Sequence, residues 1–214
     1  MQDTFWNKHY QDFALQEPSR FARYCLDSQL RDGDTVVELG CGNGRDGLAL
    51  AAKVSHYTGL DACAVAVSNF QSVVTGKPAA LAAKMKVQQA DFTSLDFNAF
   101  GVDAKRLVIY SRFSLHSINY EEAERLLRNV SNIRTAPWVM MFEVRTIFDT
   151  LYGEGTNVGP HEFKTDHYRR FIDPDLFLQD IASRFAVRYV EVASGFAPFE
   201  NQDPIVMRAV IQSR

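Results

Sequence analysis

The sequence predicts an α/β fold with one mostly parallel sheet, and three observations support this prediction. Short apolar segments alternate with helical segments between residues 35 and 144, which is typical of strands joined by crossover helices. A glycine-rich turn follows the first apolar segment. The last two apolar segments, residues 186–193 and 205–211, have no helix between them, so we expect an antiparallel hairpin at one edge of a seven-stranded sheet.

The composition favours one globular domain that spans residues 1–214. The chain is 46% hydrophobic and 23% charged, which allows a single core. Its net charge is −3, so no general attraction for nucleic acid is expected, and the basic stretch at residues 164–170 is short and contains an aspartate. The sequence has neither a long apolar run nor a basic-then-apolar leader, so we expect no membrane span and a cytoplasmic location.

The spacing of cysteine and histidine argues against a metal site. The three cysteines, Cys25, Cys41 and Cys63, form no C-x-x-C pair, and their odd number argues against a disulfide framework. The five histidines show no i, i+4 pairing. We therefore expect no metal, and the oligomeric state is not predicted.

Two helices are predicted ahead of the first strand, and they make residues 1–31 an N-terminal helical cover. The second begins at Pro18 and Ser19 and runs to about Leu30. The first, over residues 3–14, has rings spaced three or four apart at Phe5, Trp6, His9, Tyr10 and Phe13. Trp6, Tyr10 and Phe21 predict either a lid over bound ligands or packing of the helices on the core.

The remaining elements follow in chain order. Apolar strands are predicted at residues 35–39, 56–60, 86–90, 106–110 and 138–144. Helices are predicted at residues 48–54, 62–75, 120–134 and 174–182. The helix over 120–134 is the clearest, because its apolar residues recur on one face. Residues 145–172 are polar and irregular, and such a long segment in a compact domain usually carries function.

The glycine-rich turn, residues 40–47, fits the G-x-G-x-x-G string of dinucleotide sites but lies between two carboxylates. The string places a pyrophosphate on a helix N-terminus. Glu38 ends the preceding strand and Asp46 begins the helix, and both would repel a pyrophosphate. A sulfonium with an amino-acid ammonium group would instead be attracted. Gly47, which completes the string, is expected to serve helix–sheet packing.

Acidic and aromatic residues end the next two strands. Asp61 ends the second strand about 20 residues after the loop begins, and an acid there binds ribose hydroxyls of either kind of ligand. Asp91 and Phe92 end the third strand. The carboxylate can accept from an exocyclic amine and the ring can cover an adenine face. The alternative role of Asp91 is that of a helix N-cap or loop acid.

These segments together resemble a known family. VVELGCGNG, YTGLD, QQADF and LVIYSRFSLHSI resemble motifs I to IV of the class I S-adenosylmethionine-dependent methyltransferases, in the same order over residues 35–118. The resemblance implies a Rossmann-like sheet with a reversed edge hairpin and S-adenosylmethionine as cofactor. FWNKHY and EPSRFA are similar to the N-terminal cover of small-molecule members such as the thiopurine and tellurite types.

The resemblance also implies roles for the matching residues. Either Arg20 or Arg45 would pair the cofactor carboxylate, because arginine suits a bidentate contact, and the sequence does not choose between them. The other implied contacts are Glu38, Gly40, Gly42 and Gly44 for the methionine moiety and ribose, Asp61 for the ribose diol, Ala62, Asp91 and Phe92 for adenine, and Ser111 for the methionine end.

Three residues after the fourth strand are catalytic candidates. Methyl transfer from a sulfonium is an in-line displacement that depends mainly on alignment. Ligands in such sheets bind beyond the carboxyl ends of the strands, which favours Tyr110, Arg112 and His116. His116 is the best base candidate because its ordinary pKa lies near neutrality, and its alternative role is packing or capping under the next helix. The segment lacks the Asn/Asp-Pro-Pro-Tyr of enzymes that methylate nucleic-acid amines.

The insertion at residues 145–172 is predicted to line the acceptor pocket. The candidates for acceptor contact are Trp6, Tyr10, Arg145, Tyr152, His161 and Tyr168, and other charged residues beside them are Glu143, Asp149, His167, Arg169 and Arg170. Such a lining suits a small polar acceptor with an acidic or zwitterionic group, and the alternative is a solvated loop with ion pairs. We therefore predict methylation of a small polar metabolite. The alternatives are an NAD-dependent oxidoreductase and a non-catalytic S-adenosylmethionine-binding protein.

Overall fold

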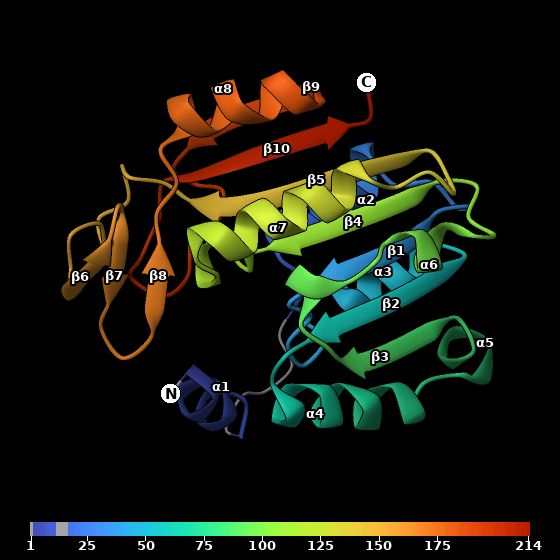
Figure 1. Cartoon of the computed structure of the whole chain (residues 1–214). Helices are drawn as coiled ribbons and strands as arrows, with labels where there is room; N and C mark the ends of the chain where they lie inside the picture. Colours follow the sequence, from blue (N-terminus) through green and yellow to red (C-terminus); the bar gives the residue numbers. More distant parts are fainter. Residues whose placement is uncertain (1, 12–16) are drawn as a thin grey trace.

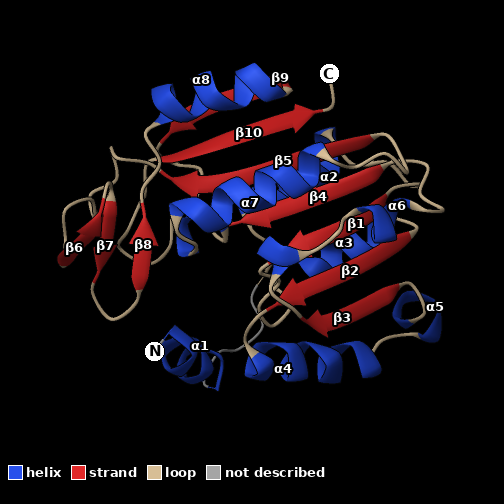
Figure 2. Cartoon of the chain, viewed as in Figure 1, coloured by secondary structure: helices blue, strands red, loops and turns tan. Residues whose placement is uncertain are grey.

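The protein is built around a seven-stranded sheet in the order β3-β2-β1-β4-β5-β10-β9 (Figures 1 and 2). The computed structural model describes residues 2–11 and 17–214. The strands are β1 (Thr35–Leu39), β2 (His56–Asp61), β3 (Met85–Gln89), β4 (Leu107–Arg112), β5 (Trp138–Arg145), β9 (Ala186–Ala193) and β10 (Val206–Gln212). Strands β1 to β5 are parallel, whereas β10 runs antiparallel to both β5 and β9. The predicted Rossmann-like sheet with an antiparallel edge hairpin is confirmed.

Helices cover both faces of this sheet. They are α2 (Arg20–Ser28), α3 (Gly47–Lys53), α4 (Ala64–Thr75), α5 (Ala79–Ala82), α6 (Asn98–Gly101), α7 (Tyr120–Ser131) and α8 (Pro174–Arg184). Ser19 caps α2 by accepting from the Ala22 amide, and a reciprocal capping box begins α7. The short helices α5 and α6 were not predicted, because four residues are too few to show a helical period.

Strand β4 shows why the sheet is buried on both sides. Successive side chains of a strand point to opposite faces. Leu107 and Ile109 join the core beneath α7 and α8, while Val108 and Tyr110 join the core beneath α2 and α3. All four are fully buried, so a continuous apolar run is what the position requires.

Residues 145–172 were predicted to be irregular, and this prediction is wrong. They contain a three-stranded antiparallel sheet of β6 (Thr156–Gly159), β7 (Glu162–Lys164) and β8 (Tyr168–Arg170). A parallel bridge between Thr146 and Ile172 closes the base of the insertion. The strands are short and mostly polar, and they lack the alternation by which a half-buried strand is recognised in a sequence.

The carboxyl ends of the parallel strands define the functional edge of the molecule. In Figure 1 the arrows of β1 to β5 point to the left, toward the small sheet and α1 (Gln2–Gln11). The predicted first helix therefore exists over residues 2–11, while its predicted end, with Phe13, lies outside the described residues. Helix α1 lies beside α4, and its Phe5 stacks on His167, which immediately precedes β8.

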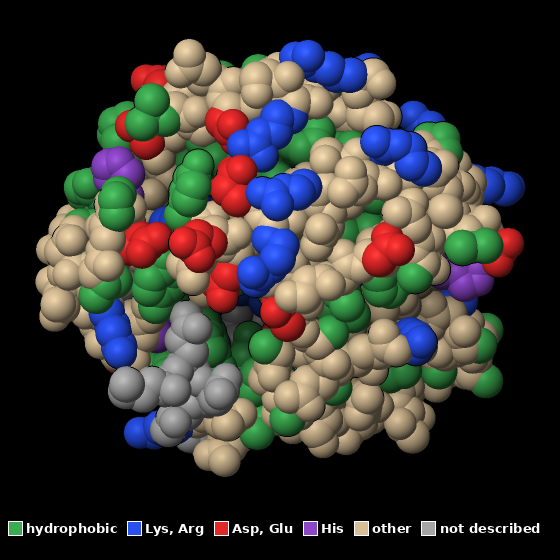
Figure 3. Space-filling model, viewed as in Figure 1, with side chains coloured by type: hydrophobic (Ala, Val, Ile, Leu, Met, Phe, Trp, Pro, Cys, Tyr) green, Lys and Arg blue, Asp and Glu red, His purple; other side chains and the backbone are tan. Residues whose placement is uncertain are grey.

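The surface carries no large area of one charge on the face shown in Figure 3, where basic and acidic side chains are interspersed. This agrees with the small net charge of −3. Within the described residues, no helix is both long and apolar enough to cross a membrane.

Candidate active site

The loop between β1 and α3 is shaped by three glycines with positive φ. The φ angles of Gly40, Gly42 and Gly44 are 70°, 53° and 90°, a region that favours glycine. Asp61 at the end of β2 fixes the loop from outside. Its Oδ2 accepts from the Gly42 amide at 2.8 Å and its Oδ1 accepts from the Cys63 amide at 2.9 Å. The predicted ribose acid therefore lies directly against the predicted cradle.

The glycines do not all face the same side. A Cβ on Gly44 would lie 2.3 Å from the Phe70 ring of α4, and one on Gly47 would lie 2.2 Å from the Tyr57 hydroxyl. At both positions, the absence of a side chain leaves room for an aromatic ring of the core. The prediction that Gly47 serves helix–sheet packing is confirmed. The missing side chain of Gly44 makes room for Phe70, and the contact of its backbone with the cofactor stays a prediction.

Glu38 is buried beneath the loop. It is only 4% exposed, and its Oε2 accepts from the Tyr57 hydroxyl at 2.5 Å. Burial raises the pKa of Glu38 well above the ordinary value, and the negative charges of Asp46 and Asp61 raise it further. Three acidic side chains therefore converge below the loop, and this region would favour a cationic group.

The raised pKa of Glu38 predicts a pH-dependent loss of stability. A raised folded-state pKa means that the contribution is fully present below the unfolded value of 4.5 and is lost as the pH rises toward the folded value. Glu38→Gln keeps an acceptor for Tyr57 and removes the titration. We expect the free energy of unfolding of this variant to gain steadily on that of wild type as the pH rises above about 4.5.

Urea unfolding of the cofactor-free chain at several pH values measures this difference. The exposed Glu121→Gln is the control, and its curve should run parallel to that of wild type. Parallel curves for Glu38→Gln as well would show that the carboxyl has no raised pKa.

Asp46 and Tyr110 hold the start of α2 and do not face a ligand. Asp46 accepts from the Ser19 amide, the Ser19 hydroxyl and the Tyr110 hydroxyl, each at 2.7 Å. The Tyr110 ring is fully buried and stacks on Phe21 with ring centres 5.1 Å apart. This does not fit the predicted contact of Tyr110 with an acceptor. It also means that the carboxylate of Asp46 is engaged within the protein.

The methionine end of the predicted site is formed by two hydroxyls above Gly40. The Oγ atoms of Ser111 and Ser114 lie 2.6 Å apart, and the Cβ of Ser114 would lie 2.8 Å from a Cβ on Gly40. Both serines are buried. Ser111 thus lies at the glycine loop as predicted, with Ser114 as its unpredicted partner.

The predicted adenine contacts are only partly at the surface. Asp91 caps a short 3-10 helix, accepting from the amide and hydroxyl of Thr93, so the alternative reading of this residue is correct in the structure. Phe92 is 8% exposed and packs in the core beneath α7, and its contact with adenine stays a prediction. Ala62 is exposed, and its carbonyl accepts from the Gln89 amide side chain at 3.0 Å.

Helix α1 covers the loop. The Tyr10 hydroxyl lies 2.7 Å from where a Cβ of Gly42 would be, and Asp61 is among the charges that raise its pKa after burial. The Asn69 side chain of α4 donates to the Tyr10 carbonyl at 2.8 Å. Phe5, toward the other end of the helix, stacks on His167 with ring centres 4.2 Å apart. The cover therefore contacts the glycine loop and the insertion together.

A group of basic side chains surrounds His116 on the acceptor side. His116 is 7% exposed, and its Nδ1 has no hydrogen-bond partner within the described residues. Burial lowers its pKa well below 6.5, and the charges that lower it further are Arg145, Arg169, His167 and Arg112. We call His116, Arg145, His167 and Arg169 the basic cluster. Its central imidazole is neutral at physiological pH.

Phe113 joins this cluster to the end of β4. Its φ of 58° is strained for a phenylalanine, and strain of this kind concentrates at functional sites. The guanidinium of Arg112 lies 4.4 Å from the ring centre and that of Arg145 lies 5.5 Å from it. Arg112 in turn donates to the buried Glu143 at 3.0 Å, and Arg208 donates to the same carboxylate at 2.7 Å.

The outer part of the insertion holds the remaining candidates. The Tyr152 hydroxyl bonds His161 Nδ1 at 2.8 Å, on an exposed surface. Burial raises the pKa of Tyr168, with Glu162 as the next cause. Tyr168 and Arg169 alternate along β8, so their side chains point to opposite faces. Of the predicted acceptor contacts, Arg145 belongs to the basic cluster, and Trp6 lies against it with its ring centre 5.4 Å from that of His167.

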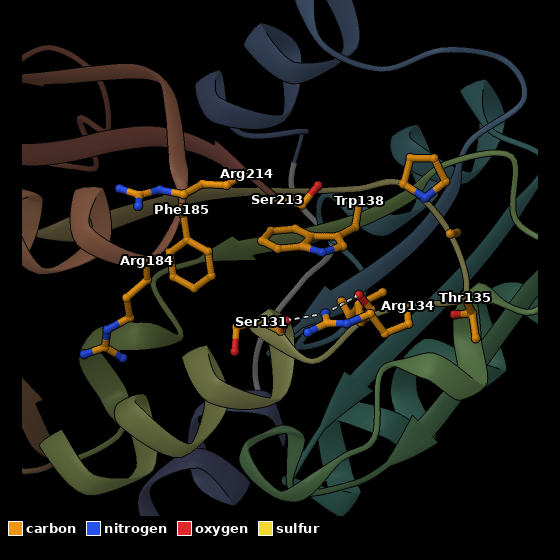
Figure 4. Close-up of a pocket in the computed structure, with 11 residues that line it drawn as sticks. Ser131, Arg134, Thr135, Trp138, Arg184, Phe185, Ser213 and Arg214 are labelled. Carbon is orange, nitrogen blue, oxygen red and sulfur yellow. Dashed lines mark hydrogen bonds between the residues drawn. The ribbon is translucent and has the colours of Figure 1, made fainter.

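Arg20 and Arg45 line a hollow of about 410 Å³ at the functional edge. Arg20 donates to the Gly195 carbonyl at 2.7 Å and Arg45 to the Glu17 carbonyl at 3.0 Å. A larger hollow of about 540 Å³ lies at the opposite edge, around Trp138 and Arg134 (Figure 4). Ligands of parallel sheets bind beyond the carboxyl ends of the strands. The sheet edge that carries the hollow lined by Arg20 and Arg45 is therefore the candidate active site.

Three residues at this edge were not predicted. Ser114 and Phe113 lie in the segment that follows β4. The motif resemblance identifies this segment, but nothing in the sequence indicates the strained backbone of Phe113. Arg208 had a recognisable signal, because it is a charged residue within an apolar strand. Its partner Glu143 is likewise charged within β5, and facing buried charges of opposite sign are expected to pair.

Comparisons with known proteins agree with this geometry. A family model described as a methyltransferase domain matches residues 36–135. A solved S-adenosylmethionine-dependent methyltransferase from Methanosarcina mazei has a TM-score of 0.70 at 17% identity, covering 88% of this chain and 96% of that one. One from Anabaena variabilis has a TM-score of 0.71 at 17% identity, covering 99% and 93%. The search of curated proteins returned no match.

A third similar structure was solved with cofactor. It is the glycopeptide N-methyltransferase MtfA complexed with S-adenosylmethionine, with a TM-score of 0.63 at 15% identity over 90% of this chain and 94% of that one. The closer likeness to the thiopurine and tellurite types stays a prediction. The match of residues 36–135 to a methyltransferase domain and the shared sheet order make this chain similar to the class I S-adenosylmethionine-dependent methyltransferases.

Proposed function

We propose that the chain transfers a methyl group from S-adenosylmethionine to a small acceptor that carries an acidic group. The observation that supports this acceptor class is the basic cluster beside Phe113 at the ends of β4 and β5. Two guanidiniums and two imidazoles meet there around a buried nitrogen that lacks a partner. Arg145 pairs with Asp149 at 2.8 Å and Arg169 lies 3.8 Å from Asp166, so an anionic group would relieve the remaining repulsion between the two guanidiniums and supply a hydrogen-bond partner for His116.

The residues around the glycine loop fit the cofactor. The positive-φ glycines bring the backbone close to a ligand, and Asp61 lies beside them to accept from ribose hydroxyls. The raised pKa of the buried Glu38 favours its neutral form, and a cationic group bound nearby would stabilise the ionised form instead. When bound, S-adenosylmethionine supplies an electrophilic methyl on a sulfonium. The work of the protein is to align the acceptor with this methyl and to exclude water beneath α1.

The two alternatives are less well supported. A dinucleotide would place its pyrophosphate near Asp61, whose carboxylate opposes it. Asp46 does not add to this repulsion, because its carboxylate accepts hydrogen bonds within the protein, including one from the Tyr110 hydroxyl. A binding protein without catalysis would not need basic residues converging on the side away from the cofactor loop.

A screen with methyl-labelled S-adenosylmethionine tests the acceptor class. Each acidic metabolite is paired with its neutral amide, and we expect label in the acidic member only. Arg145→Gln should lower kcat/KM for the active acceptor by about tenfold or more, mainly through KM, because one charge-assisted hydrogen bond contributes about 1.5–3 kcal/mol.

Two comparisons decide the outcome of this screen. Arg145→Lys keeps the charge and should recover part of the loss, whereas the exposed Arg31→Gln should have no effect. Equal labelling of acids and amides would exclude an acidic acceptor. Tight binding of S-adenosylhomocysteine without any labelled product would favour the non-catalytic alternative.

A further inference from the structure

The hollow of about 410 Å³ at the functional edge, which we call the arginine hollow, is unusually rich in positive charge. It lies between the start of α2, the glycine loop, the end of β4 and the loop that joins β9 to β10. Its charged lining consists of Arg20, Arg23, Arg45, Arg112 and Glu17. Four guanidiniums thus share a small space with one carboxylate.

Little of this charge is neutralised. Glu17 pairs with Arg23 at 3.4 Å, but both side chains are mostly exposed, and such pairs contribute little. Arg20 and Arg45 donate to backbone carbonyls, which orient a guanidinium without cancelling its charge. Arg112 is paired with Glu143, but that carboxylate also serves Arg208.

The like charges also affect one another. Burial lowers the pKa of Arg45, and the charge of Arg112 lowers it further. Two half-buried guanidiniums therefore stand near each other at an electrostatic cost that a bound anion would remove. Hydrogen bonds to carbonyls already fix Arg20 and Arg45. Their side chains would therefore lose little conformational entropy when an anion binds.

The shape and charge point to a phosphate-type anion. Arginine forks match phosphate oxygens, and a phosphate accepts from several guanidiniums, whereas a carboxylate is satisfied by one fork. Pro18, Phe196 and Pro198 add an apolar wall for the carbon skeleton that bears the anion. The volume suits a small molecule.

We propose that the arginine hollow is a subsite for a phosphate-type group of the acceptor, separate from the seat of the cofactor carboxylate. The inference rests on the proposed function, because it assigns the anion to the acceptor. Arg112 connects the two regions, since it lines the hollow and stacks on Phe113 beside the basic cluster.

Calorimetry with inorganic pyrophosphate tests the hollow on the full chain saturated with S-adenosylhomocysteine. We expect one pyrophosphate per chain at constant ionic strength. Arg23→Gln and Arg45→Gln should each weaken its affinity by about tenfold, the loss of one charged contact. Arg134→Gln removes the same charge from the hollow at the opposite edge (Figure 4) and should leave the affinity unchanged.

Three results would overturn the proposal. These are absence of pyrophosphate binding in the saturated complex, an equal loss in Arg134→Gln, and binding that S-adenosylhomocysteine abolishes, which would make the hollow the seat of the cofactor carboxylate. Failure of the chain to bind S-adenosylhomocysteine would instead contradict the proposed function. Pyrophosphate binding to the free chain, with the Arg23→Gln loss, would then still identify an anion site.

Discussion

Replacement of Asp61 by alanine should lower the affinity for S-adenosylhomocysteine by about 100-fold, or about 3 kcal/mol. The carboxylate accepts from the amides of Gly42 and Cys63, so its removal frees the glycine loop as well as the predicted ribose contact. Hydrogen bonds to a charged group contribute about 1.5–3 kcal/mol each, which makes a loss of this size reasonable. Isothermal titration calorimetry measures it.

Two further variants separate the causes. Asp61→Asn keeps one acceptor oxygen and should fall between wild type and Asp61→Ala. Asp103→Ala removes an exposed carboxylate elsewhere and should bind as wild type does. An affinity of Asp61→Ala within about threefold of wild type would remove Asp61 from the ribose role.

Gly44→Ala should destabilise the fold by about 3 kcal/mol or more. Its φ of 90° disfavours a side chain, at a cost of about 1–2 kcal/mol. The new Cβ would also lie 2.3 Å from the Phe70 ring, and overpacking of a core costs about 1–3 kcal/mol. Urea unfolding followed by circular dichroism gives the free energy of unfolding.

The chain itself offers matched controls for this prediction. Gly153 has the same φ of 90° and nothing within 4 Å of its missing Cβ, so Gly153→Ala measures the backbone cost alone. Gly47→Ala places a Cβ 2.2 Å from the Tyr57 hydroxyl and measures the steric cost. If Gly44→Ala is no worse than Gly153→Ala, Phe70 yields without cost and the packing role of Gly44 is wrong.

The large sheet could be predicted from the sequence because its strands are apolar on both faces. The predicted strand 35–39 agrees with β1, and the predicted strand 106–110 differs from β4 by one or two residues at its ends. The small sheet could not be predicted, because its three strands are three or four residues long and show no apolar alternation in the sequence.

The residues of the candidate site likewise fall into those that could be placed from the sequence and those that could not. Motif residues such as Asp61 could be placed because their position at a strand end is set by the sheet. Tyr110 and Phe92 follow the same rule in sequence, but the direction of each side chain depends on which neighbours fill the space, here Phe21 and the α7 core. Phe113 could not be predicted, because a strained φ leaves no pattern in the sequence.

The small sheet β6-β7-β8 also bears on how the activity of this chain can change. Its strands pair only with one another, and it meets the rest of the fold through the Thr146–Ile172 bridge, the hydrogen bonds from Arg170 to the Leu115 and Ile118 carbonyls, and the stacking of His167 on Phe5 of α1. None of its strands belongs to the seven-stranded sheet. Exchange of residues 147–171 for another segment could therefore alter the choice of acceptor in one evolutionary or engineering step, while the cofactor loop stays as it is.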